Sequence, residues 1–341
     1  MDPPGQGRRS GSEGARSRVG GTTGMRASSG AEGRVHIQTV TGPVDPADVG
    51  LTLPAEHFYI QQWEVTGHAG NFQLEDDDVF AEEIAAFQAV GGSCIVDQTP
   101  ACIGRRPERL RALSERTGLR IVMATGWYTD EYAPPEDRLE RLSVRAMADR
   151  LIGEIVDGVG TTGIRPGIIG EFGCARSYVS PLEERILRAS ARAARATGIA
   201  MATHAVHSEI GLDQLDLFEE EGADLTRVSI GHCDSHPHLA YWMRIAERGA
   251  FVQVDNLGEP MGRHEGRLIS LVRELVDRGF ERQILLSHDV GVVPELRYHG
   301  GRGFTYLSET FLPRLRDAGL GESVIETITV HNPKRLLTFP G

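Results

Sequence analysis

Short apolar runs alternate with amphipathic segments along most of the chain. From Arg34 onward, runs of β-branched or apolar residues are each followed by a polar break and then by a stretch with helical spacing of apolar positions. We predict strands over residues 51–53, 93–97, 120–125, 167–172, 199–204, 228–232, 250–254 and 284–289. We predict helices over residues 79–90, 142–156, 181–197, 211–221, 238–248 and 267–278.

The ends of the predicted helices carry residues that suit those positions. Ser180 followed by Pro181 is typical of an N-cap and a first helical residue, and Glu183 lies in the first turn, where the helix dipole favours negative charge. Gly198 and Gly222 come just after predicted helix ends, where glycine accepts a left-handed backbone. These signals support the predicted boundaries.

The number and order of these elements favour one α/β fold. Strand–helix alternation on this scale fits a (β/α)8 TIM barrel, which commonly needs about 250 residues plus insertions. A doubly wound open sheet is the alternative, but no G-x-G-x-x-G follows an early strand and there is no Gly-rich P-loop. We therefore predict a single barrel over residues 34–341, preceded by a disordered Gly/Ser/Arg-rich tail over residues 1–33, which has too few apolar residues to fold.

Composition narrows the classes of partner. The chain has 341 residues and a net charge of −12, from 36 Lys and Arg against 48 Asp and Glu, so polyanions such as nucleic acid and anionic membranes would be repelled. Four cysteines in a chain of this length do not make a disulfide framework, and no apolar run approaches the roughly 20 residues of a membrane span. We predict a cytoplasmic protein with a small-molecule substrate, and we leave open whether it forms a homodimer.

Polar residues end five of the predicted strands. Barrel enzymes carry their chemistry at the carboxyl ends of their strands, so these side chains are expected to converge near the barrel axis. Imidazole nitrogen and carboxylate oxygen are the ligands expected for zinc or a similar divalent ion. Taken singly, each histidine could be a hydrogen-bonded structural residue and Asp289 a helix cap. Together they predict a metal site formed by His57, Glu171, His204, His232 and Asp289.

The strand-end motifs resemble the phosphotriesterase family of the amidohydrolase superfamily, in its glutamate-bridged branch. The likeness runs from Val35 to Leu337 and rests on short segments in the same order: Gly167-Ile168-Ile169-Gly170-Glu171, Ala202-Thr203-His204, Ile230-Gly231-His232-Cys233-Asp234, Leu286-Ser287-His288-Asp289 and His331-Asn332-Pro333. The resemblance implies a hydrolase with a binuclear metal site. One metal would be held by an H-x-H on the first strand and the aspartate of the eighth, the other by the histidines of the fifth and sixth, with a carboxylated lysine or a glutamate from the fourth as bridge.

The chain departs from this pattern in two places. Its only lysine is Lys334, within the last ten residues, so a lysine bridge is excluded and Glu171 becomes the candidate. Where the family has H-x-H, this chain has Ala55-Glu56-His57. The metal on that side would keep His57, Glu171 and Asp289, and either one or two divalent ions are expected, with zinc ahead of manganese, cobalt and iron. Glu56 is a weak substitute ligand because neighbouring residues of a strand face opposite sides.

These residues predict a hydrolase of the lactonase or phosphotriesterase kind. A bound metal would lower the pKa of a water molecule and so activate hydroxide, with Asp289 as the proton acceptor. The bond attacked is that of a lactone, carboxylic ester, amide or phosphotriester. For substrate contacts we predict Trp127, Tyr128 and Arg263, which lie in loops after strands. The alternative is a homologue that binds metal or ligand without hydrolysis, or a lyase, because Ala55 weakens the first metal position.

Overall fold

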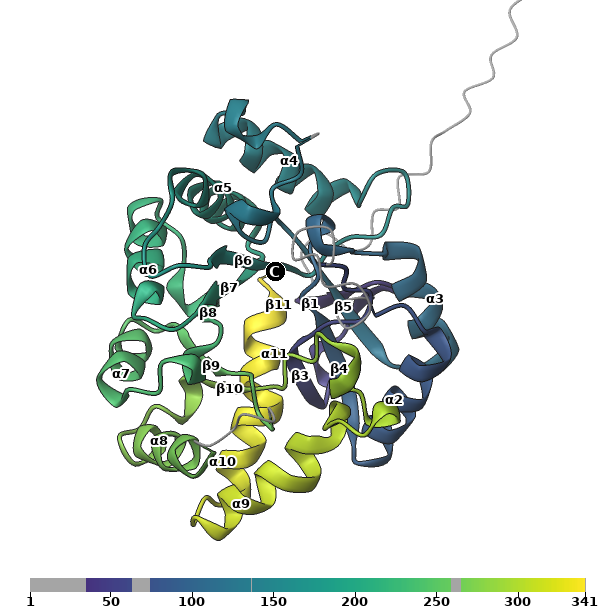
Figure 1. Cartoon of the computed structure of the whole chain (residues 1–341), viewed down its shortest axis with the longest axis vertical. Helices are drawn as coiled ribbons and strands as arrows, with labels where there is room; N and C mark the ends of the chain where they lie inside the picture. The colour runs from purple at the N-terminus through teal and green to yellow at the C-terminus, as the bar shows by residue number, and fades with distance from the viewer. Residues whose placement is uncertain (1–34, 63–73, 136, 259–264, 341) are drawn as a thin grey trace, which may run out of the picture. The chain divides into compact units, whose positions relative to one another are not determined.

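Eight parallel strands form a barrel whose two edges meet between β3 and β10. The computed structural model describes residues 35–62, 74–135, 137–258 and 265–340. The strands are adjacent in the order in which they occur along the chain (Figure 1). They are β3 (Leu51–Glu56), β4 (Gly92–Asp97), β5 (Arg120–Thr125), β6 (Ile168–Cys174), β7 (Ala200–Ala205), β8 (Val228–Ile230), β9 (Phe251–Val254) and β10 (Ile284–Leu286).

The barrel is closed by backbone hydrogen bonds just beyond β10. The N–H of Asp289 donates to the carbonyl of Ala55 at 3.0 Å, and the N–H of His57 donates to the carbonyl of Val290 at 3.1 Å. These bonds place the segment after β10 directly beside the end of β3. The predicted (β/α)8 barrel is confirmed.

Helices surround the barrel and connect successive strands (Figure 1). They are α2 (Asp77–Ala89), α3 (Pro107–Thr117), α4 (Val144–Asp157), α5 (Pro181–Thr197), α6 (Ile210–Glu220), α7 (Leu239–Glu247) and α8 (Glu265–Asp277), followed after β10 by α9 (Leu312–Asp317), α10 (Glu322–Glu326) and α11 (Asn332–Leu337). α3, α9, α10 and α11 are absent from the predicted set. In the described part of the chain, no helix is long and apolar enough to cross a lipid bilayer.

α5 begins and ends where the sequence indicates. The Ser180 hydroxyl accepts a hydrogen bond from the N–H of Glu183, whose carboxylate in turn accepts from the N–H of Ser180, which is a capping box. Gly198 follows the last turn with φ 74°, a left-handed conformation that glycine adopts at little cost. Local sequence therefore determines both ends of this helix.

Alternation along the strands divides the apolar residues into two cores. Ile95, Ile121 and Met123 pack outward among the helices, whereas their neighbours Val96 and Val122 face the barrel interior. At the amino-terminal end, the interior core is completed by Ile37 of β1 (His36–Thr39) and by Leu336 and Leu337 of α11. This end is therefore filled with apolar side chains, which leaves the carboxyl ends of the strands for polar chemistry.

A small antiparallel sheet, absent from the predicted elements, adjoins the filled end. β1 (His36–Thr39) pairs with both β2 (Gly42–Val44) and β11 (Thr338–Phe339). It joins residues from the two ends of the described chain, and such a long-range pairing of short strands leaves little local pattern. The predicted tail over residues 1–33 lies outside the described residues, and the division into tail and barrel domain stays a prediction.

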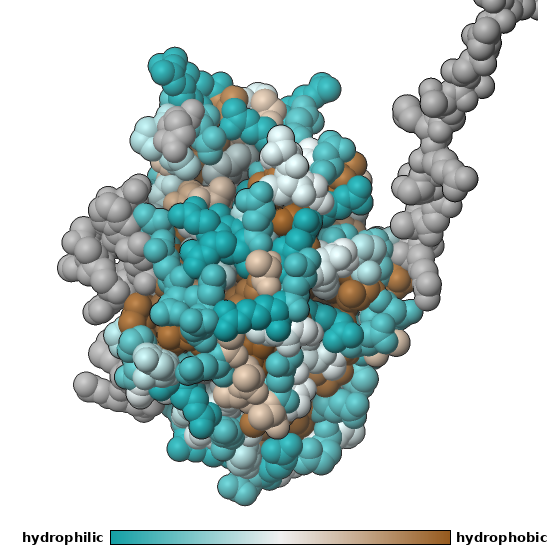
Figure 2. All heavy atoms as spheres, turned by 90° about the vertical axis from the view of Figure 1, so that its right-hand side faces the viewer, coloured by the Kyte–Doolittle hydropathy of each residue, from teal (hydrophilic) through white to brown (hydrophobic). Residues whose placement is uncertain are grey.

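The face that carries α2 and α3 is mainly hydrophilic, with scattered apolar residues (Figure 2). Two ion pairs join these helices: Arg109 to Asp77 at 2.9 Å and Arg116 to Asp78 at 2.7 Å. Exposed pairs of this kind contribute about 0–1 kcal/mol each. The fold is therefore held mainly by its two apolar cores.

Candidate metal centre

Five predicted ligands lie together at the carboxyl ends of the strands. Glu171 lies within β6 and His204 within β7, while His57, His232 and Asp289 come just after β3, β8 and β10. Their potential ligand atoms form two groups, each with all ligand atoms within 4.8 Å of one another: Glu171, His204 and His232, and His57, Glu171 and Asp289. Glu171 belongs to both.

In the first group, one oxygen of Glu171 faces two imidazoles. Glu171 Oε1 lies 2.6 Å from His204 Nδ1 and also contacts His232 Nε2 closely. The two ring nitrogens are themselves 2.8 Å apart. Two nitrogens and one oxygen directed at one point form a donor set that suits a divalent first-row ion.

In the second group, the other oxygen of Glu171 turns toward His57. Glu171 Oε2 lies 3.7 Å from His57 Nε2, and Asp289 Oδ1 lies 3.1 Å from the same nitrogen. The two carboxylate oxygens of Glu171 therefore each face one group, as a bridging ligand would require. This group offers one nitrogen and two carboxylates, which also fits a divalent ion.

An extra residue in β6 turns Glu171 toward the site. Ile169 pairs with Met201 and Phe172 pairs with Thr203, so three steps along β6 match two along β7. Ile169 and Phe172 both pack in the outer core, although residues an odd number apart on a regular strand face opposite sides. A β-bulge re-aims side chains in this way.

Two of the candidate ligands have a left-handed backbone. His232 has φ 54° and Asp289 has φ 55°. Residues other than glycine rarely adopt this conformation, and Asn, Asp and His are the ones most often found in it. Hydrogen bonds hold both turns, because the N–H of His232 donates to Asp255 at 3.0 Å and the N–H of Asp289 to Ala55 at 3.0 Å.

Two imidazoles are oriented by neighbours outside the candidate ligand set. His232 Nδ1 donates to Asp255 Oδ1 at 2.9 Å, which leaves Nε2 free to face Glu171. His57 Nδ1 lies 2.9 Å from the hydroxyl of Thr99, which itself donates to Asp97 at 2.8 Å. Such partners fix the ring and the tautomer of metal-binding histidines.

The electrostatics of the centre favour positive charge. Burial opposes charge at each group, but Asp289 and Glu171 outweigh it and raise the pKa of His57 to about 10. In the same way, Asp255 and Glu171 raise the pKa of His232 well above its usual value. Conversely, His232 and His204 hold the pKa of Glu171 well below its usual value despite burial. A point that stabilises protons on imidazole in this way also attracts a cation.

Ala55 is buried beside His57, and Glu56 faces elsewhere. Ala55 is 4% exposed. Glu56 accepts hydrogen bonds from the Ser287 hydroxyl at 2.7 Å, from the N–H and Nδ1 of His288, both at 2.9 Å, and from the N–H of Val290 at 2.9 Å. Its carboxylate is thus fully occupied in the wall between β3 and β10, away from the two ligand groups.

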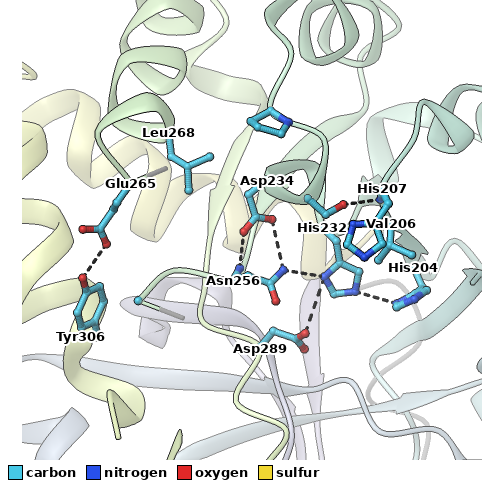
Figure 3. A pocket seen from close by; sticks show the side chains of 13 residues that line it. His204, Val206, His207, His232, Asp234, Asn256, Glu265, Leu268, Asp289 and Tyr306 are labelled. Atoms are coloured by element: carbon cyan, nitrogen blue, oxygen red, sulfur yellow. Dashed lines mark hydrogen bonds and ion pairs between the residues drawn. The ribbon is translucent and has the colours of Figure 1, made fainter. Parts of the chain in front are cut away.

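A cavity of about 480 Å³ opens beside the centre (Figure 3). Its wall includes three candidate metal ligands, His204, His232 and Asp289, and also apolar residues such as Leu268. The cavity can therefore hold an organic molecule against the candidate ligands. Its lining residues are His204, Val206, His207, His232, Asp234, Ser235, Pro237, Asn256, Gly258, Glu265, Leu268, Asp289 and Tyr306.

The predicted substrate contacts have different positions. The Tyr128 hydroxyl lies 3.3 Å from His204 Nδ1, and the two rings meet edge to face at 4.8 Å. Trp127 is 6% exposed, packs in the outer core and donates its indole N–H to Asp137 at 3.1 Å. Neither Trp127 nor Tyr128 is among the residues that line the cavity, but Tyr128 contacts His204, which is. Arg263 lies outside the described residues.

Thr99, Asp255 and Asn256 contact the centre but are missing from the predicted site. Asp255 and Asn256 follow β9, the seventh barrel strand, and therefore stand at a strand end like the predicted ligands. Their location directly after a strand can be read from the sequence and could have marked both residues as candidates for the site. The choice of His232 as the partner of Asp255 depends on the pairing of β8 with β9 and has no local signal.

Comparison with known proteins places this geometry in context. A model of the phosphotriesterase family matches residues 35–337. The phosphotriesterase homology protein of Escherichia coli is 31% identical over 288 residues, covering 84% of this chain and 97% of that protein. The human N-acetyltaurine hydrolase is 29% identical, covering 89% of this chain and 98% of that protein.

A solved structure shares the whole barrel. A lactonase from Listeria monocytogenes superimposes with a TM-score of 0.84 at 27% identity, covering 90% of this chain and 100% of the lactonase. The similarity thus extends over nearly the full length of each protein, and the resemblance predicted from the strand-end motifs is confirmed.

Proposed function

The chain belongs to the phosphotriesterase family, and on that premise we propose that it hydrolyses an acyl bond of a small organic molecule at the centre formed by His57, Glu171, His204, His232 and Asp289. The family and its relatives make it a metal-dependent hydrolase. The observation that supports the assignment of these residues is Glu171, with one oxygen toward His204 and His232 and the other toward His57.

We propose that Glu171, His204 and His232 hold one divalent ion and that His57, Glu171 and Asp289 hold a second, more weakly. The first group has two imidazoles, whereas the second has one, because Ala55 occupies the position of the first histidine of the family motif. Zinc suits both donor sets, and manganese, cobalt and iron are the alternatives. A metal bound there lowers the pKa of a water molecule and polarises a carbonyl oxygen.

Asp289 has the position and charge of a proton carrier. It lines the cavity, and its side chain is 21% exposed, which is enough for contact with a substrate. Burial opposes its ionisation, but His57 and His232 hold its pKa below the usual value, so it is a carboxylate at neutral pH. We propose that it accepts a proton from the attacking water and passes it to the leaving atom as the acyl bond breaks.

Tyr128 is proposed to orient the acyl group. Burial and the nearby charges of Glu171 and Asp289 raise the pKa of its phenol, so the hydroxyl keeps its proton. A protonated phenol beside His204 can donate a hydrogen bond to a substrate oxygen. Removal of the hydroxyl should therefore raise KM for acyl substrates.

Two relatives indicate an acyl rather than a phosphoryl centre. One is named for hydrolysis of N-acetyltaurine, an amide, and the other is a lactonase. We therefore propose that the substrate is an amide, lactone or carboxylic ester, with phosphotriester cleavage as a side activity.

Metal content and turnover test the proposal together. Metal should be removed with a chelator and restored as zinc or manganese, and the protein assayed against lactones, aryl esters, N-acyl amines and phosphotriesters. We expect bound metal by elemental analysis and turnover that returns with it. Glu171→Gln should abolish both, while Glu184→Gln, on the exposed side of α5, should change neither. Turnover that survives in Glu171→Gln would remove Glu171 from the site.

The substitution at Ala55 favours a second candidate, a protein that binds metal and ligand without turnover. A missing ligand lowers metal affinity in the second group while leaving the first intact. This candidate predicts stoichiometric metal, saturable binding of a small acyl compound and no product. Product formation beyond one equivalent of enzyme excludes it.

A further inference from the structure

Asn256 lines the cavity beside the proposed proton carrier. It comes just after β9 and belongs to the cavity wall together with Asp289 and His232. Asn256 Nδ2 lies 3.3 Å and Asp289 Oδ2 lies 3.8 Å from the same atom, Nδ1 of His232. The two side chains therefore lie near the same ring nitrogen of His232 at the cavity wall (Figure 3).

Two carboxylates determine which way the Asn256 amide points. Nδ2 donates to Asp255 Oδ1 at 3.2 Å and to Asp234 Oδ1 at 3.4 Å. The reverse orientation would press the amide oxygen against two carboxylate oxygens. The nitrogen must therefore face Asp234 and Asp255.

This orientation directs the amide oxygen into the cavity. Figure 3 shows Oδ1 of Asn256 turned away from Asp234, on the side of Asp289. None of the hydrogen bonds recorded for the described residues uses this oxygen, and the side chain is partly exposed. The backbone N–H of Asn256 donates to Asp234 at 2.8 Å, which holds the residue in place. The cavity thus contains a fixed hydrogen-bond acceptor next to the proton carrier.

We infer that Asn256 Oδ1 accepts a hydrogen bond from the N–H of a secondary amide, so that the chain prefers N-acylated amines to esters and lactones. This inference rests on the proposed hydrolase function and specifies its substrate class. A site that accepts a hydrogen bond from a substrate N–H discriminates strongly against an analogue that lacks this donor.

The chemistry of amide cleavage explains why the acceptor suits this position. The water oxygen bonds to the carbonyl carbon, Asp289 accepts the water proton, and the C–N bond breaks with its electron pair on nitrogen, which takes that proton from Asp289. A carboxylic acid and an amine result. The original N–H stays on nitrogen throughout and can donate to Oδ1, which turns the nitrogen lone pair toward Asp289. The leaving oxygen of an ester has no hydrogen and would bring its lone pairs against Oδ1.

The test compares an amide and an ester with the same acyl group. The probes are 4-nitroacetanilide and 4-nitrophenyl acetate, assayed with the metal-loaded protein and with Asn256→Ala. The readout is the ratio of kcat/KM for the amide to kcat/KM for the ester, because intrinsic reactivity cancels when variant and parent are compared. We expect this ratio to fall about tenfold or more in Asn256→Ala, the loss of one hydrogen bond to substrate.

Glu184→Gln, on the exposed side of α5, is the control variant. It contacts neither Asn256 nor the cavity, so it should keep the ratio within about twofold. A second measurement needs no variant: N-methylation of the amide removes the donor, and we expect it to lower kcat/KM of the parent protein at least tenfold.

Each outcome is decisive. Equal losses for amide and ester in Asn256→Ala would show that Asn256 only supports the structure, and turnover of the ester without any turnover of amides would also overturn the inference while leaving a hydrolase. No turnover of either class by metal-loaded protein would overturn the proposed function itself and this inference with it.

Discussion

Asp255 binds His232 twice, through the ring and through the backbone. Its Oδ1 accepts from Nδ1 of His232 at 2.9 Å and from the N–H of the same residue at 3.0 Å. One carboxylate therefore fixes the tautomer of the imidazole and also the left-handed turn that places it, with φ 54°. The position of His232 at the proposed metal site depends on a residue that is not itself a ligand.

Asp255→Asn is expected to weaken metal binding without removing a ligand. The amide can still contact the ring but does not stabilise it by charge, and loss of such a partner typically lowers metal affinity roughly 10- to 100-fold. Competition with a chromogenic zinc chelator measures the change. The control is Asp213→Asn, an exposed residue in the first turn of α6, which should leave the affinity unchanged. Unchanged affinity in Asp255→Asn would show that His232 needs no such support.

Glu56→Gln is expected to destabilise the protein. Glu56 is fully buried and accepts four hydrogen bonds, three on Oε1 and one on Oε2. In glutamine, an NH₂ group takes the place of one oxygen and meets a donor such as the N–H of Val290. The lost charge-assisted bonds and the unsatisfied donor should lower the free energy of unfolding by about 2–4 kcal/mol.

Urea denaturation of metal-free protein measures this change, so that metal binding does not contribute. The exposed Glu184→Gln serves as the control, because surface substitutions usually alter stability by less than about 0.5 kcal/mol. Equal stability of the two variants would mean that the Glu56 network contributes nothing net.

The sequence indicates which side chains come together at the strand ends better than it indicates the direction in which each of them points. His57, His204, His232 and Asp289 end strands, and barrel geometry alone brings strand ends together. Glu171 is different, because simple alternation from Ile168, which faces the barrel interior, would turn it toward the helices. The extra residue between Ile169 and Phe172 reverses this, and the bulge is visible only in the pairing with β7.

Long-range partners explain the other differences between sequence and structure. The contact of Asp255 with His232 depends on the pairing of β8 with β9, and the contact of Glu56 with His288 joins segments that are brought together only when the barrel closes. The β1–β2–β11 sheet likewise pairs residues near position 37 with residues near position 338. Periodicity reports local structure, so it identified the strands and most of the helices but not these contacts.

Metal binding is expected to release protons. In metal-free protein at pH 7, His57 is protonated, since its pKa is raised to about 10, and the pKa of His232 is raised in the same direction. Only neutral imidazole binds a metal, so each such histidine must lose a proton. Raising the pH toward 10 therefore removes the competing protons. Metal affinity should increase with pH, by up to about tenfold per pH unit for each proton released.

Calorimetry in buffers of different ionisation enthalpy measures the number of protons released. His57→Gln should release fewer than the parent protein, because glutamine carries no proton to lose. Affinity that is independent of pH between 6 and 9, with no proton release, would contradict the raised pKa values of the two histidines.

Ala55→His is expected to strengthen the second metal position. In the H-x-H pattern of the family, residues 55 and 57 would both face the metal, and the carbonyl of Ala55 is fixed by its hydrogen bond from Asp289 at 3.0 Å. An imidazole there would give the His57, Glu171 and Asp289 group a second nitrogen, matching the group of Glu171, His204 and His232.

Titration with zinc, followed by elemental analysis, should show a second equivalent bound at least tenfold more tightly than in the parent protein, a gain of about 1.4 kcal/mol. Ala55→Asn adds bulk without an imidazole and should not produce this gain. If Ala55→His binds no more metal than Ala55→Asn, then β3 does not direct residue 55 to the centre, and the second position must be formed by other groups.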